Sequence, residues 1–340
     1  LERYSVSFTL PMAYVYLEPA DVITITSDNG TLELRIAQIN YTSNGLVECQ
    51  AKYNNNAVYV AAAIGEEGLS TGADIVFKSA SLYVLLDIPC LQDQFNVPGF
   101  AAAMCGYSST WPGGVIFKSS DEGQTWLDVQ GFTGAVPIGF STTALATGRT
   151  DIVDSANTLT IALLAGELSS VTQAQMLNGS NYFAIGAHGR WEIVAAQNCV
   201  LNVDGTYTLS DFLRGRFGTE WAMTTHAVGD AVVYLNDADL AFVGMETASI
   251  GSERLYRGIT AGSDIDSDSD LTFTYAGVNL ECLSPVYLNG SRHPTTRDWT
   301  LTWIRRTRID GSLRNYVDAA LGETTEAYEI EIYDGAGYTT

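Results

Sequence analysis

The chain has 340 residues, enough for about two or three domains, and carries a formal net charge of −22. This charge excludes stable nucleic-acid binding through the phosphate backbone, because that mode requires clustered Lys and Arg. No stretch approaches the roughly 20 consecutive apolar residues of a membrane-spanning helix, so we expect no membrane span. The first residue is Leu rather than Met, and we therefore expect an internal piece of a longer protein.

Residues 1–86 contain short runs rich in β-branched and aromatic side chains, a composition typical of strands. Asn-Gly dipeptides in SDNG (27–30) and TSNG (42–45) separate successive runs and predict hairpin turns. The separated runs are DVITIT (21–26), LELRIAQINY (32–41) and LVECQAKY (46–53). We predict a compact β-meander or barrel domain over 1–86, followed by the Pro-containing connector DIPCLQDQFNVPG (87–99).

A second β-rich domain is predicted over 87–283. Its strand-like runs are GVIFKSS (114–120), QTWLDV (124–129), NTLTIALL (157–164), YFAIGA (182–187), RWEIVAA (190–196), CVLNV (199–203), DAVVYL (230–235), AFVGME (241–246) and LTFTYAGV (271–278). Helical signals are few. SSVTQAQMLNG (169–179) predicts one short helix capped by Ser or Thr, and LSDFLRG (209–215) predicts a single helical turn.

The last segment, 284–340, alternates again in WTLTWIRR (299–306) and AYEIEIY (327–333). Trp299, Leu301 and Trp303 share one face of the first run, which is the period of a strand packed on one side. We predict the opening of a small β-sandwich here. The whole chain is therefore predicted to be all-β and multi-domain.

One Asp-box, the S-x-D-x-G-x-T-W pattern of sialidase propellers, lies in FKSSDEGQTWLDV (117–129). Its pattern residues are Ser119, Asp121, Gly123, Thr125 and Trp126. The Asp is expected to cap a turn, the Gly to supply a positive φ, and the Trp to pack beneath a hairpin. A propeller requires several copies at blade spacing, and no repeat of 20 to 50 residues is found. The hairpin interpretation is favoured, and a secreted carbohydrate-binding or sialidase-like β-protein is the alternative.

The loop GSDIDSDSD (262–270) places aspartates at alternate positions, as calcium loops do. These aspartates are Asp264, Asp266, Asp268 and Asp270. Counted from Asp264, the turn glycine of an EF-hand is Ser269 and the chelating Glu is Tyr275; counting from Asp266 also fails. A solvated acidic loop is favoured, and calcium binding by Asp264–Asp270 stays open.

Two arginine-containing blocks also need an interpretation. LRGRFGTE (213–220) is followed by no G-K-[ST], so it is no P-loop, and arginines anchoring a tight turn are expected. TWIRRTRIDG (302–311) places Arg305, Arg306 and Arg308 in one strand. We expect them to pair with carboxylates, most simply those of ETTEAYEIE (323–331).

No residue is assigned a catalytic, cofactor-binding or metal-binding role. The histidines, 188, 226 and 293, form no H-E-x-x-H pair, and the sequence contains no G-x-S-x-G elbow. The five cysteines, 49, 90, 105, 199 and 282, are scattered without a C-x-x-C, so we expect buried free thiols. We predict a protein without enzymatic activity and without a cofactor.

Four segments together resemble one family. HGRWEIVAAQNCVLNVDGTYTLSDFLRGRFGTEWAMTTHAVGDAVVYL (188–235) resembles a stretch of the tail-tip or baseplate hub proteins of long-tailed phages and gene transfer agents, a host-specificity, tip-attachment-like family. GGVIFKSSDEGQTW (113–126) is similar to that family's V-Y-x-S-x-D-G hairpin, and DWTLTWIRRTRIDG (298–311) to its W-x-R-R-T-R segment. LPMAYVYLEPADVITIT (10–26) matches its hub β-domain, with Ala20 in place of the more usual Gly.

The resemblance implies a hub β-barrel domain over 1–86, a second tail-tip domain over 87–283 and the start of a fibronectin-III-like sandwich over 284–340. It implies a structural virion protein at the distal end of the phage tail, assembled in the bacterial host cytoplasm. Such a protein closes the tail tube, supports fibres, and takes part in host attachment and genome ejection. The implied partners are itself as a homotrimeric ring, the distal tail protein, the tape-measure protein, and tail fibre or receptor-binding proteins.

Overall fold

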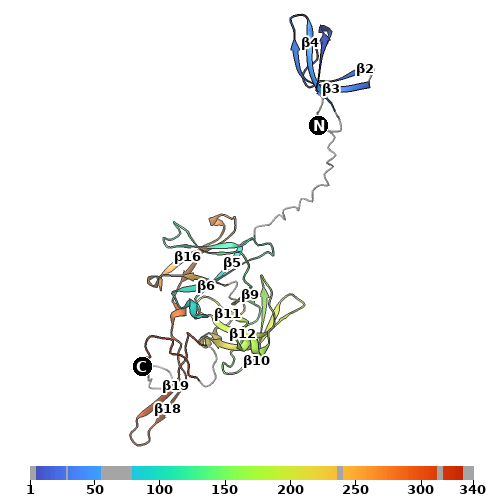
Figure 1. The fold of residues 1–340 in the computed structure, drawn as a ribbon. Helices are drawn as coiled ribbons and strands as arrows, with labels where there is room; N and C mark the ends of the chain where they lie inside the picture. The colour runs from blue at the N-terminus through green and yellow to red at the C-terminus, as the bar shows by residue number, and fades with distance from the viewer. Residues whose placement is uncertain (1–4, 28–29, 55–78, 236–239, 312–316, 332–340) are drawn as a thin grey trace. The chain divides into compact units, whose positions relative to one another are not determined.

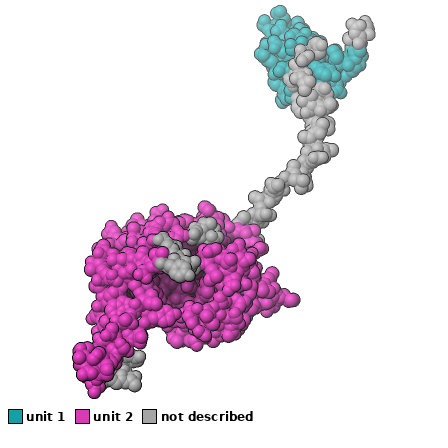
Figure 2. Space-filling model, turned by 60° about the horizontal axis from the view of Figure 1, so that its bottom comes forward, with its two compact units in different colours: residues 1–75 teal, residues 76–340 magenta. Residues whose placement is uncertain are grey.

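The computed structural model describes residues 5–27, 30–54, 79–235, 240–311 and 317–331. The chain divides into two compact units, Leu1–Ile75 and Val76–Thr340, shown in separate colours in Figure 2. Sheets make up both units, so the all-β, multi-domain prediction is confirmed. No helix in the described ranges is long and apolar enough to cross a membrane.

The described part of unit 1 is an antiparallel four-stranded sheet of order β1-β4-β3-β2 (Figure 1). Its strands are β1 (Ser5–Pro11), β2 (Val22–Ser27), β3 (Gly30–Tyr41) and β4 (Leu46–Tyr53). Alternate side chains of β3 and β4 form its buried face: Leu34, Ile36, Val47, Cys49 and Ala51. The three strands predicted around the Asn-Gly turns are confirmed, and β2 and β3 pair up to Ser27 and Gly30.

Unit 2 contains a closed barrel of order β10-β13-β12-β11-β14-β9, which occupies the green to yellow part of Figure 1. Its strands are β9 (Ile138–Ser141), β10 (Asp154–Leu163), β11 (Tyr182–Gly186), β12 (Glu192–Leu201), β13 (Tyr207–Arg216) and β14 (Ala231–Tyr234). Closure leaves no strand edge in this part unpaired. Its core contains side chains such as Leu159, Phe183 and Phe212, each at most 1% exposed.

Two further sheets adjoin the barrel in unit 2. One has the order β15-β6-β5, with β5 (Ser81–Leu86), β6 (Gly99–Gly106) and β15 (Ala241–Gly244). The other has the order β17-β16-β7-β8, with β7 (Gly114–Ser119), β8 (Leu127–Phe132), β16 (Glu253–Thr260) and β17 (Leu271–Thr274). β5 lies within the predicted first domain but pairs with β6 of unit 2, and residues 55–78 lie outside the described ranges. The predicted boundaries at 86 and 283 stay predictions.

The predicted helix is confirmed as α2 (Gln173–Leu177). The Thr172 hydroxyl accepts the Gln175 N–H while the Gln175 side chain accepts the Thr172 N–H, which is a capping box. Short 3-10 turns supply the other helical segments: η1 (Met12–Tyr14), η2 (Asp93–Phe95), η3 (Glu220–Thr225), η4 (Thr247–Ser249), η5 (Ile265–Ser267) and η6 (Val278–Leu280).

The helical turn predicted for 209–215 is wrong, because these residues lie in β13. Leu209 pairs with Leu159 of β10 on one side and with Cys199 of β12 on the other. Hydrogen bonding on both edges outweighs the local capping signal of Ser210. Asp211 adopts a φ of +56°, which bends the strand near the shifted register of β10.

The C-terminal part contains the hairpin β18 (Val286–Arg292) and β19 (Trp299–Ile304). Leu301 and Trp303 are half-buried, as the alternation predicted, whereas Trp299 is 59% exposed. The strand predicted over 327–333 is wrong in its described part, because residues 327–331 form no ladder. Glu323 and Glu326, just before this run, form ion pairs with Arg308 and Arg305.

Candidate functional site

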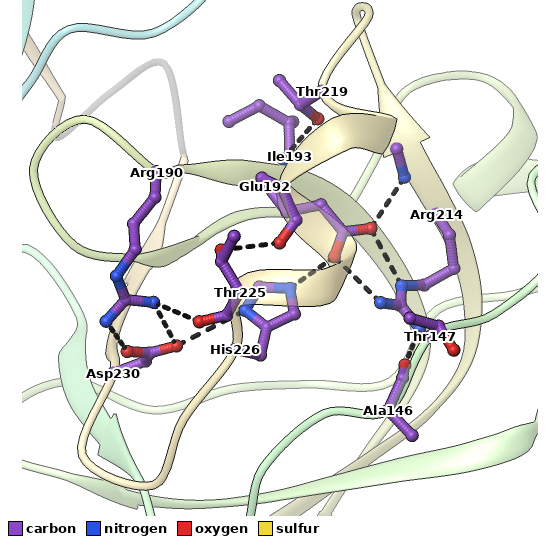
Figure 3. A network of polar contacts seen from close by, with 12 residues as sticks. Ala146, Thr147, Arg190, Glu192, Ile193, Arg214, Thr219, Thr225, His226 and Asp230 are labelled. Atoms are coloured by element: carbon purple, nitrogen blue, oxygen red, sulfur yellow. Dashed lines mark hydrogen bonds and ion pairs between the residues drawn. The ribbon is translucent and has the colours of Figure 1, made fainter. Parts of the chain in front are cut away.

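A buried polar network joins β12, β13 and the loop after η3 (Figure 3). Arg214 of β13 is 1% exposed, and its Nε and Nη2 donate to the two carboxylate oxygens of Glu192, each at 2.9 Å. Its Nη1 donates to Asp154 Oδ2 at 3.1 Å and to the Ala146 carbonyl at 2.8 Å. Glu192 itself is completely buried. A bidentate, fully desolvated ion pair therefore lies within the barrel.

The network continues through His226 to a second ion pair. His226 Nε2 lies 2.6 Å from Glu192 Oε2, and Nδ1 lies 3.4 Å from Asp230 Oδ2. Both guanidinium NH2 groups of Arg190 bind Asp230, and its Nη1 also donates to the Thr225 carbonyl at 2.9 Å. The imidazole thus bridges one buried carboxylate from β12 and another from the loop before β14.

The LRGRFGTE block supplies much of this network's support. Gly215 donates its N–H to Glu192 Oε1 at 2.8 Å, and its φ of +55° is one that glycine adopts readily. A Cβ on Gly215 would lie 2.8 Å from the Glu220 Cα. Thr219 Oγ1 accepts the Ile193 N–H at 2.9 Å and donates to the Arg216 carbonyl at 2.7 Å. The expectation that arginines of this block form carboxylate and carbonyl bonds is confirmed for Arg214 but not for Arg216, whose buried Nε has no hydrogen-bond partner.

Hydrogen bonding keeps the acids of the network ionised. Burial by itself raises the pKa of Glu192, but the bonds with His226 and Arg214 outweigh it and hold the pKa below the usual range. The pKa of Asp154 is lowered in the same way, against burial, by Asn157 and Arg214. The pKa of Asp230 is lowered, again against burial, chiefly by Arg190.

The chemistry of this network is structural. His226 and its two carboxylates have side chains no more than 2% exposed, so no substrate reaches them. Arg190, at 31%, is the partly accessible member. Sequence reasoning missed these partners; the available signal was Glu192, a charged residue inside the apolar run WEIVAA. The network fastens β12, β13 and the approach to β14, and so supports closure of the barrel.

The Asp-box forms the turn between β7 and β8. Asp121 Oδ1 accepts the Thr125 N–H at 2.9 Å and Oδ2 accepts its hydroxyl at 2.6 Å, while Gly123 has a φ of +86°. The side-chain bond with Thr125 is the main reason that the pKa of Asp121 falls to about 2. Trp126 packs with one face against the Arg257 guanidinium, 4.4 Å away. The predicted capping Asp and left-handed Gly are confirmed.

The acidic loop is held by the same arginine. Arg257 Nε donates to Asp270 Oδ1 at 2.6 Å, and its Nη1 donates to Asp266 Oδ1 at 2.7 Å. Asp268 accepts the Gly258 N–H at 2.9 Å, and Asp264 caps η5. Each of these carboxylates therefore binds an N–H donor. Among the described residues, no group of three or more His, Cys, Asp or Glu side chains could hold a metal ion.

The arginines of TWIRRTRIDG pair with acids, as predicted, but their placement in one strand is wrong, because β19 ends at Ile304 and all three follow it. Arg305 binds Glu326 at 2.9 Å and Arg308 binds Glu323 at 2.7 Å, and both acids belong to the expected run. Arg306 instead binds Glu220, the last residue of LRGRFGTE, at 2.8 Å. The C-terminal segment is thereby attached to the turn that supports the barrel network.

The cysteines are free thiols, as predicted, and all but one are buried: Cys49, Cys90, Cys105 and Cys199. Burial raises the pKa of Cys105 to about 11 and that of Cys199 to about 12, so both stay protonated and unreactive near neutral pH. Cys282 is exposed, contrary to the expectation of burial.

Comparison with known families gives two matches. Residues 136–233 match a family described as Rcc01698-like, C-terminal, and residues 1–39 match one described as Putative phage tail protein. The first match begins just before β9 and ends within β14, so it coincides with the closed barrel and contains its polar network. No curated protein matches the chain. The second match indicates a phage tail protein with a structural role in the virion.

Proposed function

We propose that this chain is part of the tail-tip or baseplate hub at the distal end of a long-tailed phage or gene transfer agent particle. The observation that carries this proposal is the coincidence of the matched segment 136–233 with the closed barrel, beside a tail-protein match at 1–39. The hub would close the tail tube, support fibres, and take part in host attachment and genome ejection. The distal tail protein, the tape-measure protein and fibre or receptor-binding proteins would be its neighbours.

Assembly into a homotrimeric ring is part of this proposal. The described part of unit 1 offers two sheet edges, β1 and β2, and hydrogen bonding along such edges is a common way to join subunits. It also exposes many apolar side chains, all at least 38% exposed: Met12, Tyr14, Val15, Tyr16, Val22, Leu32, Tyr41, Leu46 and Tyr53. So much exposed apolar surface on a small sheet favours burial against another subunit.

The charge distribution supports passage of DNA through such a ring. A net charge of −22 repels phosphates. Several basic side chains that could hold DNA are engaged elsewhere: Arg214 is buried, and the TWIRRTRIDG arginines bind Glu326, Glu220 and Glu323. We propose that carboxylates outnumber Arg and Lys on the channel surface.

The proposed role is mechanical rather than enzymatic. Glu192 with His226 resembles an acid–base dyad, but both side chains are closed to substrate. The secreted sialidase-like alternative rested on the Asp-box, whose residues are accounted for by a hairpin turn. Turnover of a sialoside that is abolished by Asp121→Ala would support that alternative and contradict the structural role.

Two measurements test the proposal. Particles decorated with an antibody fragment against unit 2 should carry the label only at the distal tip of the tail in electron micrographs. Label along the tail shaft or at the head would exclude a hub.

Native mass spectrometry of the purified chain should show trimers. Tyr16→Ser together with Val22→Ser should shift the chain to monomers, because both side chains lie on the exposed apolar surface of unit 1. Val203→Ser is the matched control, since Val203 is fully exposed in unit 2 and should leave the trimer intact. A monomeric wild-type chain would contradict the ring.

A further inference from the structure

A cavity of about 480 Å³ opens in unit 2 beside the barrel network. Three segments form most of its wall: 217–221, which follows β13, 274–278, which follows β17, and 281–284, which leads into β18. Its aromatic lining comes from His188, Trp191, Phe217 and Trp221, and its acidic lining from Asp87 and Glu281. Its volume lies within the range typical of small-ligand sites.

Hydrogen bonds and an ion pair fix these walls relative to one another. Asp87 accepts the N–H groups of Ala276 and Val278, at 2.6 and 3.0 Å, and so holds the second segment. Arg306 donates to the Ser284 carbonyl at 2.6 Å and binds Glu220 at 2.8 Å, which joins the third segment to the first. The cavity is therefore formed before any ligand arrives, and binding needs little ordering of the chain.

Segments 217–221 and 281–284 are also closely packed against each other. Gly218 has a φ of +82°, and a Cβ at this position would lie 2.8 Å from Leu283 Cδ2. Elsewhere in the lining, the His188 ring packs against Phe273 with ring centroids 4.7 Å apart. Both aromatic and acidic side chains are thus presented from a rigid frame.

The two acidic side chains of the lining differ in their surroundings: both oxygens of buried Asp87 accept backbone N–H groups, whereas Glu281 is exposed. Neither Asp87 nor Glu281 forms an ion pair with another described residue, and no Lys or Arg of the described chain lines the cavity. Asp87 is 6% exposed, and burial, partly offset by its backbone hydrogen bonds, raises its pKa. Glu281 is therefore the carboxylate to which a cation entering the cavity would supply a counter-charge.

The lining of the cavity also includes an exposed indole. Trp221, in η3, is 57% exposed although it is the largest type of side chain. Aromatic faces beside carboxylates form the environment that binds organic cations, through cation–π attraction and ion pairing together. Arg suits such a site best, because its planar guanidinium stacks on rings and binds carboxylates at two points.

We propose that this cavity receives a basic side chain, Arg in preference to Lys, from a partner protein. The exposed Glu281 carboxylate, which forms no ion pair with another described residue, selects a positive guest, and the aromatic lining packs against the apolar stem and the guanidinium face. A saccharide would also use the aromatic faces, but it would leave the Glu281 carboxylate without a counter-ion. The inference requires only this cavity, and it stands whether or not the chain forms a tail-tip hub.

The test uses the purified chain and the peptide acetyl-Gly-Arg-Gly-amide as the probe. Binding is followed by the NMR signal of the Trp221 indole N–H, which is assigned by its loss in Trp221→Phe. We expect a saturable shift with the Arg peptide, and binding about tenfold weaker for the isosteric citrulline peptide, which lacks the charge. N-acetylglucosamine trimer serves as the saccharide probe.

Paired variants separate the site from general effects. Because Trp221→Ala removes the indole reporter, the variants are compared by isothermal titration calorimetry, and Glu281→Gln and Trp221→Ala should each weaken binding of the Arg peptide about tenfold. Their matched controls are Glu167→Gln, an exposed acid outside the cavity, and Trp299→Ala, an indole of nearly equal exposure at 59%; both should bind like the wild type. Equal binding of the citrulline peptide, saturation by the saccharide alone, or no saturable binding of the Arg peptide would each overturn the proposal.

Discussion

Two arginines of unit 2 bind two carboxylates each: Arg214 within the barrel, and Arg257 of β16 at the acidic loop. Arg214 and its partners Glu192 and Asp154 have side chains that are 0%, 0% and 4% exposed. Arg257, with Asp266 and Asp270, has side chains that are 16%, 80% and 40% exposed. The pairing chemistry is the same, but water replaces a lost partner only in the loop. Removing a charge should therefore lower the free energy of unfolding strongly in the barrel and only slightly in the loop.

Glu192→Gln should give the largest loss of stability. The change keeps the shape but leaves Arg214 and His226 without their shared carboxylate in a site closed to water. We expect a loss of about 3–5 kcal/mol in the free energy of unfolding, measured by urea denaturation. Arg149→Ala, which breaks an ion pair with partners 67% and 47% exposed, is the control and should match the wild type. A loss in Glu192→Gln no larger than in the control would contradict the comparison.

Acid should weaken the barrel through its buried carboxylates. The pKa values of Glu192, Asp154 and Asp230 are lowered in the folded protein, so their contribution to stability is present above their ordinary pKa. It is lost as the pH falls through the lowered values, below about pH 4. Asp87 acts in the opposite direction, because burial raises its pKa. The melting temperature, measured from pH 7 to pH 2, tests this. In Glu192→Gln the melting temperature should fall less steeply below about pH 4 than in the wild type. An equal fall in both proteins would show that the network does not cause the acid sensitivity.

Arg308→Gln tests a position of intermediate burial. Its guanidinium binds both oxygens of Glu323, at 2.7 and 3.2 Å, with side chains 10% and 27% exposed. We expect a loss of about 1–2 kcal/mol, because charged hydrogen bonds are lost but water enters in part. The loss should be local: limited proteolysis should cut the C-terminal segment sooner while the barrel stays intact. Equal rates of cleavage in wild type and variant would show that this ion pair contributes as little to stability as the exposed ones.

Arg257→Gln should have the smallest effect. Its partners lie largely in water, so we expect a loss of about 1 kcal/mol or less in the free energy of unfolding. Addition of calcium tests whether the same loop binds a metal ion. Because Arg257 already supplies a cation to Asp266 and Asp270, millimolar calcium should leave the wild-type melting temperature unchanged. A clear rise with calcium, and none with magnesium, would show that the loop is a calcium site.

Short-range signals in the sequence were sufficient for several elements. The Asn-Gly signals placed β2, β3 and β4 within a few residues, because a short connection fixes the pairing of the strands beside it. The helix at 173–177 was found because its capping box is complete between Thr172 and Gln175. The Asp-box turn was predicted correctly for the same reason, since its bonds join residues at most four apart.

Signals that span the fold could not be recognised in this way. Ser210 and Gly215 look like a helix start and stop, yet β10 and β12 pair with both edges of that segment and make it a strand. Strand β16, Glu253–Thr260, was not predicted, although it lies at the centre of its sheet between β17 and β7. The helix or strand preference of a short segment has less influence than hydrogen bonding to a neighbouring strand on each side.

The sequence by itself determined the all-β class, the hairpin turns, the helix at 173–177 and the acidic partners of Arg305 and Arg308, but not that of Arg306. Only the tertiary structure decided which charges are buried and what meets in the cavity. Arg214 lies 22 residues from Glu192 and 60 from Asp154, so their contact depends on barrel closure. Asp87 meets Ala276 across 189 residues. Local order depends on bonds between near neighbours, whereas desolvation, which sets the energy of each charge, depends on how the whole chain packs.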